Sequence, residues 1–147
     1  MYLVSACLLG QDTKYNGGNN RNEAVIEFAE KHSVFPVCPE SRGGLPVPRP
    51  PAERVGDRVI NREGEDVTGM FLAGARSSLA IALSEAERRG EKIEGAILKA
   101  NSPSCGSGLI YDGSFTGTTV RGDGCFTELL KELGIKVISE KEFDCND

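Results

Sequence analysis

The sequence is poor in histidine and has no long apolar run. His32 is the only histidine among 147 residues, which excludes zinc sites built from several histidines. No apolar run approaches the roughly 20 residues needed to span a bilayer. The N-terminus also lacks the basic and apolar regions of a secretory signal peptide. We therefore expect a soluble, cytoplasmic protein that does not insert into a membrane.

Several motifs that bind nucleotides or metals are missing too. Neither a P-loop nor a G-x-G-x-x-G run follows the first predicted strand, which argues against phosphate binding of those types. No C-x-x-C pair occurs, so zinc-ribbon and thioredoxin-like sites lose their main support. With 17 basic and 22 acidic residues the net charge is −5, which gives no overall basic footprint for nucleic acid. We expect a small-molecule partner, and the sequence does not indicate an oligomeric state.

The length and the five cysteines favour one domain in a reducing compartment. A chain of 147 residues can bury roughly two-thirds of its unfolded surface without disulfides or metals, so residues 1–147 are expected to form a single domain. Five is an odd count and far below the cysteine density of a secreted disulfide scaffold. Cytoplasmic thiols are more often ligands, nucleophiles or buried packing groups than bridges.

Short apolar runs alternate with stretches of helical periodicity. The apolar runs predict strands at Tyr2–Ala6, Val34–Val37, Gly95–Leu98 and Lys136–Ile138. The periodic stretches predict helices from about Glu23 to His32, from Asp66 or Thr68 to Gly90, and from Cys125 to Leu133. Strands that alternate with helices indicate βαβ units. The predicted fold is therefore α/β: one Rossmann-like domain with a small, mostly parallel four-stranded sheet flanked by helices.

Two finer features follow from the same patterns. The long second helix is expected to bury Leu72 and Leu83 on its apolar face. An inserted hairpin is predicted at Ser107–Phe115, because an apolar run there meets Asp112-Gly113, a strong hairpin turn dipeptide.

Three of the cysteines come directly after predicted strands. These are Cys7, Cys38 and Cys105. Ligands of an open parallel sheet bind outside the carboxyl ends of its strands, so we expect the three thiols to meet at one rim. Three thiolates without a histidine partner suit a soft metal, either zinc or an iron–sulfur cluster. The alternative is that each cysteine is simply a small buried apolar group, and this alternative stays open for Cys125 and Cys145.

Polar residues beside these cysteines are further candidates. Glu40 stands two residues after the second thiol, and Ser102 and Ser104 precede the third. Arg49, in a proline-rich loop, could lie over the site as a ligand for an anion or a carbonyl group, although such loops are often only stiff connections. Lys99 could supply positive charge near a cluster or a substrate.

Three motifs occur in order along the chain. They are Ser5-Ala6-Cys7-Leu8-Leu9-Gly10, Cys38-Pro39-Glu40 with Gly43 to Arg49, and Ser102-Pro103-Ser104-Cys105-Gly106 with Ile110-Tyr111-Asp112-Gly113. Together they resemble the thiouracil desulfidase family, and the resemblance extends from Met1 to about Phe143. It is closest to the short, single-domain form of that family.

The resemblance implies an oxygen-sensitive [4Fe-4S] cluster bound by Cys7, Cys38 and Cys105, with the fourth iron open. In the chemistry proposed for the family, the thiocarbonyl sulfur of a thiolated pyrimidine binds that iron and water attacks the ring carbon. Sulfur leaves as hydrogensulfide, the product is the oxo base, and no net redox change occurs. Such an iron is a soft Lewis acid matched to sulfur.

The resemblance also implies roles for the neighbouring polar residues. Glu40 matches the acid/base of the family, and Ser102, or else Ser104, is expected to supply a catalytic hydroxyl. Arg49 and Lys99 are expected to bind the substrate because of their positive charge beside the site, and not because of the resemblance. The sequence does not separate 2-thio from 4-thio substrates, or a free base from a nucleoside or nucleotide.

Two other classes of function remain open at this point. The same three cysteines could serve a metal-binding or sulfur-carrier module without catalysis, or could be inert packing in an interaction protein. Cys125 and Cys145 have no role in a three-ligand scheme, and a fourth thiol ligand would close the open iron.

Overall fold

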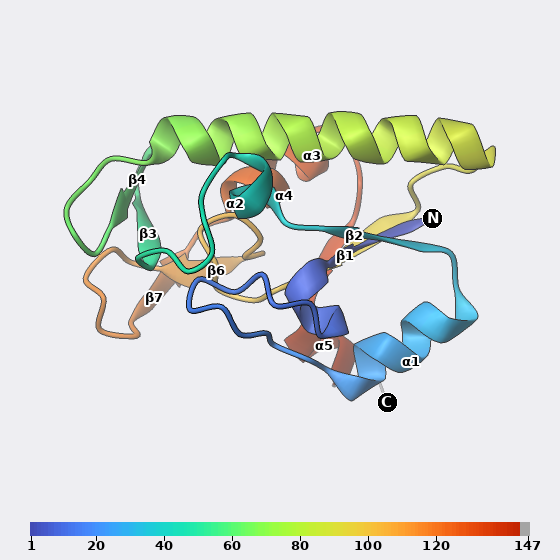
Figure 1. The fold of residues 1–147 in the computed structure, drawn as a ribbon, viewed down its shortest axis with the longest axis horizontal. Coiled ribbons are helices and arrows are strands. Elements are labelled where there is room, and N and C mark those ends of the chain that lie inside the picture. Colours follow the sequence, from blue (N-terminus) through green and yellow to red (C-terminus); the bar gives the residue numbers. More distant parts are fainter. Residues whose placement is uncertain (145–147) are drawn as a thin grey trace.

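A four-stranded parallel sheet forms the middle layer of the structure, a computed structural model that describes residues 1–144 (Figure 1). Its strands are β1 (Tyr2–Ser5), β2 (Val34–Val37), β5 (Gly95–Leu98) and β8 (Val137–Ser139). They lie in the order β2-β1-β5-β8, and each neighbouring pair is parallel. The predicted α/β fold with a small parallel sheet is confirmed.

Helices cover both faces of this sheet. One face carries α2 (Pro39–Arg42), α3 (Thr68–Arg89) and α4 (Cys125–Glu132), and the other carries η1 (Ala6–Leu9), α1 (Glu23–Lys31) and α5 (Glu140–Asp144) (Figure 1). Successive side chains of a strand point to opposite faces. Leu3 and Val4 are accordingly both fully buried, Leu3 in the α3–α4 core and Val4 in the α1 core.

The buried face of α3 differs from the prediction. Leu72 and Leu83 are 40% and 49% exposed, so the expectation that they are buried is wrong. Phe71, Gly74 and Ala75 face the core instead. At Gly74 the physical reason is the neighbouring helix α2, whose Pro39 carbonyl oxygen leaves no room for a larger side chain.

Two antiparallel hairpins extend beyond the sheet, on the side of the molecule where β1 ends (Figure 1). They consist of β3 (Ala52–Val55) with β4 (Arg58–Asn61), and of β6 (Leu109–Tyr111) with β7 (Thr119–Arg121). The inserted hairpin predicted at Ser107–Phe115 exists, but its extent was wrong. Asp112 and Gly113 open a long loop, because Asp112 accepts a hydrogen bond from the Ser114 N–H and Gly113 bonds to Glu53.

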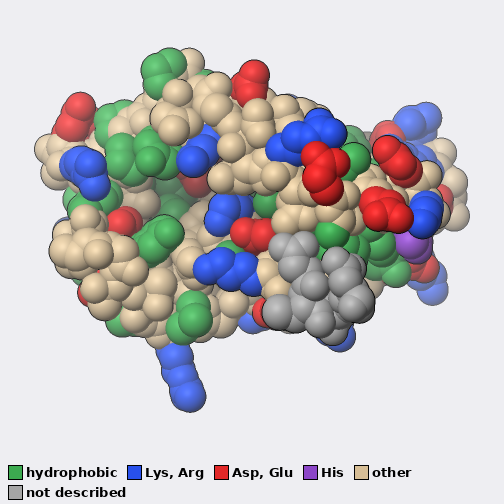
Figure 2. All heavy atoms as spheres, turned by 90° about the horizontal axis from the view of Figure 1, so that it is seen from below, with side chains coloured by type: hydrophobic (Ala, Val, Ile, Leu, Met, Phe, Trp, Pro, Cys, Tyr) green, Lys and Arg blue, Asp and Glu red, His purple; other side chains and the backbone are tan. Residues whose placement is uncertain are grey.

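Among residues 1–144, no helix is both long enough and apolar enough to cross a membrane. Figure 2 shows acidic and basic side chains interspersed over the face seen from below, rather than gathered by sign. Cys145 lies outside the described residues.

Candidate functional site

A cavity of about 400 Å³ lies at the carboxyl ends of β1, β2 and β5. Its walls include all eight residues singled out from the sequence: Cys7, Cys38, Glu40, Arg49, Lys99, Ser102, Ser104 and Cys105. They come from three strand ends and one proline-rich loop that are far apart in the chain. The parallel arrangement of the strands brings these residues together. Cys125, which begins α4 and does not follow a strand, is buried but is not among the residues that line this cavity.

Cys7 lies in η1, the single turn that follows β1. Gly10 ends this turn with φ of 91°, a left-handed conformation that favours glycine. Burial raises the pKa of the Cys7 thiol, while a hydrogen bond from the Asn20 side chain acts in the opposite direction. Asn20 was not predicted, because a single asparagine in a Gly- and Asn-rich loop carries no distinguishing signal.

Cys38 immediately precedes α2, which begins at Pro39. Its thiol donates a hydrogen bond to Ser41 Oγ at 3.3 Å. Glycines in α3 and after α2 allow the two helices to pack backbone against backbone. A Cβ on Gly74 would lie 1.9 Å from the Pro39 carbonyl oxygen, and one on Gly43 would lie 2.1 Å from the carbonyl oxygen of Met70. This contact fixes the turn that carries Cys38.

Cys105 lies in a turn that is bound to the N-terminus of α4. The first N–H groups of a helix lack intrahelical partners, and here Phe126 N–H donates to the Ser104 carbonyl at 2.9 Å. The Thr127 hydroxyl donates to the Cys105 carbonyl at 2.8 Å. Gly124 permits the approach, since its Cβ would lie 2.4 Å from the Ser104 carbonyl carbon. Burial raises the pKa of the Cys105 thiol to about 12.

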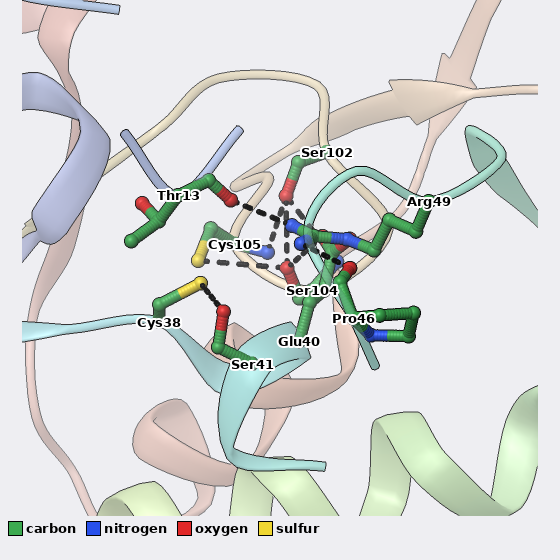
Figure 3. A network of polar contacts seen from close by, with 9 residues as sticks. All are labelled: Thr13, Cys38, Glu40, Ser41, Pro46, Arg49, Ser102, Ser104 and Cys105. Atoms are coloured by element: carbon green, nitrogen blue, oxygen red, sulfur yellow. Dashed lines mark hydrogen bonds and ion pairs between the residues drawn. The ribbon is translucent and has the colours of Figure 1, made fainter. Parts of the chain in front are cut away.

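A chain of hydrogen bonds connects Glu40 with the two serines (Figure 3). Ser104 Oγ donates to Glu40 Oε2 at 2.9 Å and lies 3.2 Å from Ser102 Oγ. Ser102 Oγ in turn accepts the Cys105 N–H at 2.7 Å. Because Ser104 Oγ donates its single proton to Glu40, Ser102 is the donor between the two hydroxyls. The carboxylate and both hydroxyls thus form one continuous path for a proton.

Arg49 holds the other oxygen of the same carboxylate. Its side chain is 4% exposed, and Nε donates to Glu40 Oε1 at 3.1 Å. The remaining guanidinium nitrogens donate to the carbonyl oxygens of Pro46 and Thr13, at 3.3 and 2.8 Å (Figure 3). A buried charge needs such pairing. Arg49 therefore fixes Glu40 and ties two loops together at the cavity wall.

Lys99 follows β5 and lies at the cavity wall near α5. Its ammonium group is 3.2 Å from Glu140 Oε2 and donates to the Ala100 carbonyl at 3.2 Å. The same Glu140 accepts the Ala100 N–H through its other oxygen at 2.6 Å. Glu140 thereby secures the end of β5, and Lys99 presents a paired positive charge to the cavity.

The donor set of the cavity is rich in thiols. Cys7, Cys38 and Cys105 line it together, and no histidine is among the residues that line it. Cysteine thiolates are the usual ligands of iron–sulfur clusters. Within residues 1–144, no group of three or more Cys, His, Asp or Glu side chains is arranged to hold a single metal ion. The thiols that line the cavity are therefore a donor set that suits an iron–sulfur cluster.

Part of the cavity wall comes from the two hairpins and includes aromatic side chains. Tyr111 and Phe115 line it from the β6–β7 hairpin, and Glu53 and Arg62 from the β3–β4 region. None of the four was predicted from the sequence as a site residue, although Tyr111 belongs to the third motif. A signal for β3–β4 was present, because Gly56-Asp57 between two Arg-Val pairs is a hairpin turn dipeptide.

The fold and the site together define an α/β protein with a thiol-rich cavity at the carboxyl ends of its strands. The family model of 2-thiouracil desulfurase matches residues 2–142, and the chain belongs to that family. The chain is also similar to the uncharacterized protein YbbK of Bacillus subtilis (strain 168), with 38% identity over 154 residues and 98% of each chain covered.

Comparison with a solved structure supports the same family. The chain is similar to the [4Fe-4S]-dependent thiouracil desulfidase TudS, with a TM-score of 0.82 and 43% identity. The match covers 96% of this chain and 91% of that one. The family inferred from the three sequence motifs is confirmed.

Proposed function

We propose that this protein is a [4Fe-4S]-dependent desulfidase that converts thiouracil and water into uracil and hydrogensulfide. The observation that carries the proposal is that three thiols and a carboxylate–hydroxyl chain line one cavity. Membership of the 2-thiouracil desulfurase family and the likeness to TudS support it.

Cys7, Cys38 and Cys105 would hold the cluster. When bound, the cluster supplies a soft Lewis acid that draws electron density from the C=S bond. The cavity of about 400 Å³ has aromatic as well as thiol lining residues, which suits a small flat substrate. Cys125 lies outside this cavity, which is consistent with three protein ligands.

The hydrogen-bond chain determines how the protein would move protons. Ionised Glu40 accepts from Ser104, which leaves Ser104 Oγ able to accept from Ser102. Ser102 is the more exposed of the two serines. It would take a proton from the attacking water in exchange for its long contact with the Ser104 N–H, at 3.3 Å, while keeping the Cys105 N–H. Each proton then moves one hydrogen bond towards Glu40, which later returns it to the departing sulfur.

Arg49 and Lys99 contribute charge in different ways. All three kinds of nitrogen of the Arg49 guanidinium are engaged with protein oxygens, so Arg49 acts by holding Glu40 in place. Lys99 is 26% exposed at the cavity wall and is free to turn one N–H towards a substrate oxygen or ring nitrogen.

The reaction balances without an electron donor or acceptor. Water supplies the oxygen of the new C=O bond, the C–S bond breaks, and sulfur leaves with its electron pair as hydrogensulfide. The two protons of water end on the sulfur and on the protein's acid/base chain, or in solvent.

Anaerobic reconstitution with iron and sulfide tests this proposal. The loaded protein is expected to show charge-transfer absorption and to release hydrogensulfide and uracil from thiouracil in equal amounts. A protein that takes up no cluster would contradict the proposal. A protein that takes up a cluster but releases no sulfide would be a metal-binding or sulfur-carrier module instead.

Glu40→Gln tests the proton path. This variant should retain the absorption spectrum of the cluster and lose desulfidation by at least ~100-fold, the scale of general acid–base catalysis. Glu30→Gln removes an exposed carboxylate of α1 and should change neither. Full activity in Glu40→Gln would remove this residue from the mechanism.

A further inference from the structure

Phe115 has an unusual backbone conformation for its size. Its φ is 58°, in the left-handed region that bulky residues rarely adopt, yet its side chain lines the site cavity. The two neighbouring glycines of the loop, Gly113 and Gly117, have positive φ as well, but glycine adopts such values freely. A strained backbone at a residue whose side chain lines a ligand cavity is a reason to look for a function.

A buried carboxylate holds this conformation in place. Glu53 is 8% exposed, and its Oε1 accepts the N–H groups of both Gly113, at 2.9 Å, and Phe115, at 3.1 Å. Glu53 lies on β3, so one hairpin fixes the loop of the other. Gly113 is also pressed against β3, since a Cβ there would lie 2.3 Å from a methyl group of Val55.

The ring of Phe115 is oriented by a cation as well. The guanidinium carbon of Arg62 lies 5.3 Å from the ring centroid, within the range of a cation–π contact. Arg62 follows β4, so the β3–β4 hairpin contacts both the backbone and the ring of Phe115. These contacts present a rigid aromatic group to the cavity that also holds the three thiols.

We propose that Phe115 is a specificity-determining residue, on which the flat, unsaturated ring of the substrate stacks, and that Glu53 is its positioning residue. The identity of the ligand rests on the proposed function. Stacking requires an unsaturated ring, whereas binding through the thiocarbonyl group alone does not. The protein should therefore prefer 2-thiouracil over 5,6-dihydro-2-thiouracil, which keeps the C=S group but has a puckered, saturated C5–C6 bond.

Equilibrium binding to the cluster-loaded protein tests this preference, and it is measured in the Glu40→Gln background so that 2-thiouracil is not consumed. Phe115→Leu keeps apolar volume but removes the ring, and should weaken binding of 2-thiouracil about tenfold, the scale of base–aromatic stacking. Binding of dihydro-2-thiouracil should change less than threefold. Phe115→Tyr should restore the preference, and Leu109→Ala, an exposed site in the same hairpin, should not affect it. Equal losses for both ligands, or no loss, would overturn the proposal.

Glu53 is tested by the same pair of ligands. Glu53→Gln keeps an oxygen that accepts both N–H groups and should retain the preference for the unsaturated ring. Glu53→Ala should lose it to the same degree as Phe115→Leu, and combining the two changes should add nothing further. A purely structural role for Glu53 would weaken both ligands equally, or would add to the effect of Phe115→Leu, and either result would contradict a positioning role.

Binding and turnover separate the two proposals. If the wild-type protein binds 2-thiouracil but releases no sulfide, the desulfidase proposal fails and the binding ratios still decide the role of Phe115. If sulfide is released and the ratios do not change in Phe115→Leu, only the stacking proposal fails. No binding of 2-thiouracil to the wild-type protein would overturn both.

Discussion

The turns that carry Cys38 and Cys105 each place a thiol at the same cavity, but different contacts hold the two turns in position. Both follow a parallel strand and both present a thiol to one cavity. The Cys38 turn is fixed by backbone packing against α3, at Gly43 and Gly74. The Cys105 turn is fixed by hydrogen bonds to the N-terminus of α4, including that from Thr127.

The two thiols consequently differ in exposure. Cys38 is partly exposed and hydrogen-bonded to Ser41, and it also lines a second cavity of about 340 Å³. Cys105 is 5% exposed, and its carbonyl and N–H groups are both bonded within the protein. The hydrogen-bonded turn thus holds the Cys105 thiol in the protein interior, whereas the turn packed against α3 holds the Cys38 thiol nearer the protein surface.

Removal of the thiols should have the largest effect. Changing Cys7, Cys38 or Cys105 singly to Ser should abolish most iron incorporation, because three ligands leave none to spare. The double variant Cys125→Ser and Cys145→Ser should keep the cluster. Iron and acid-labile sulfide analysis after anaerobic reconstitution measures both. Loss of iron from the double variant would show that the three-ligand assignment is wrong.

Thiol alkylation should distinguish Cys38 from Cys105 in the metal-free protein. Iodoacetamide attacks thiolates, and a Cys105 pKa of about 12 leaves very little thiolate at pH 8. We expect Cys38 to be alkylated at least ~100-fold faster than Cys105. Mass spectrometry of the cysteine peptides gives both rates, and unfolding in urea should make them equal. Similar rates in the folded protein would contradict the contrast in burial.

Gly74→Ala tests the packed turn. The new methyl group would meet the Pro39 carbonyl, and two backbones cannot move apart as a flexible side chain can. The free energy of unfolding should fall by about 3 kcal/mol. Gly69→Ala is the matched control on α3, since nothing lies within 4 Å of its Cβ. It should be neutral or stabilising by about 0.5–1 kcal/mol. Urea titration compares the two, and equal stability would refute the close contact.

Thr127→Val tests the hydrogen-bonded turn and should have the smallest effect. It keeps the shape of the side chain but leaves the buried Cys105 carbonyl without the hydroxyl donor. The expected cost is about 1–2 kcal/mol. Thr118→Val, at an exposed position, should cost less than about 0.5 kcal/mol. Indistinguishable urea midpoints for the two variants would mean that this bond does not secure the turn.

The regular part of the fold was predictable because its signals are local. The limits predicted for Val34–Val37 and Gly95–Leu98 coincide with β2 and β5. Helix α1 begins where Asn22 accepts the Val25 N–H, as expected of an N-cap. Continuous apolar runs between helices indicate buried parallel strands, and the position of a residue at a strand end then places it at the rim.

The rest of the site depends on contacts between distant segments. No local pattern shows that Gly74 must be small, because the requirement comes from α2. Arg49 was expected near the site, but its bond to Glu40 follows from the folding of a proline-rich loop. Likewise, Glu53 and Phe115 meet only once two hairpins have packed together. Such contacts depend on the tertiary structure and cannot be inferred from the spacing of residues along the sequence.

The most direct test of the account is the source of oxygen in the product. Cluster-loaded protein is incubated anaerobically with thiouracil in H₂¹⁸O, without any reductant, and uracil and hydrogensulfide are quantified. Hydrolysis of C=S at this cavity predicts one ¹⁸O atom in each uracil formed and one hydrogensulfide released with it. Unlabelled uracil, or sulfide release that requires an added electron donor, would contradict the account.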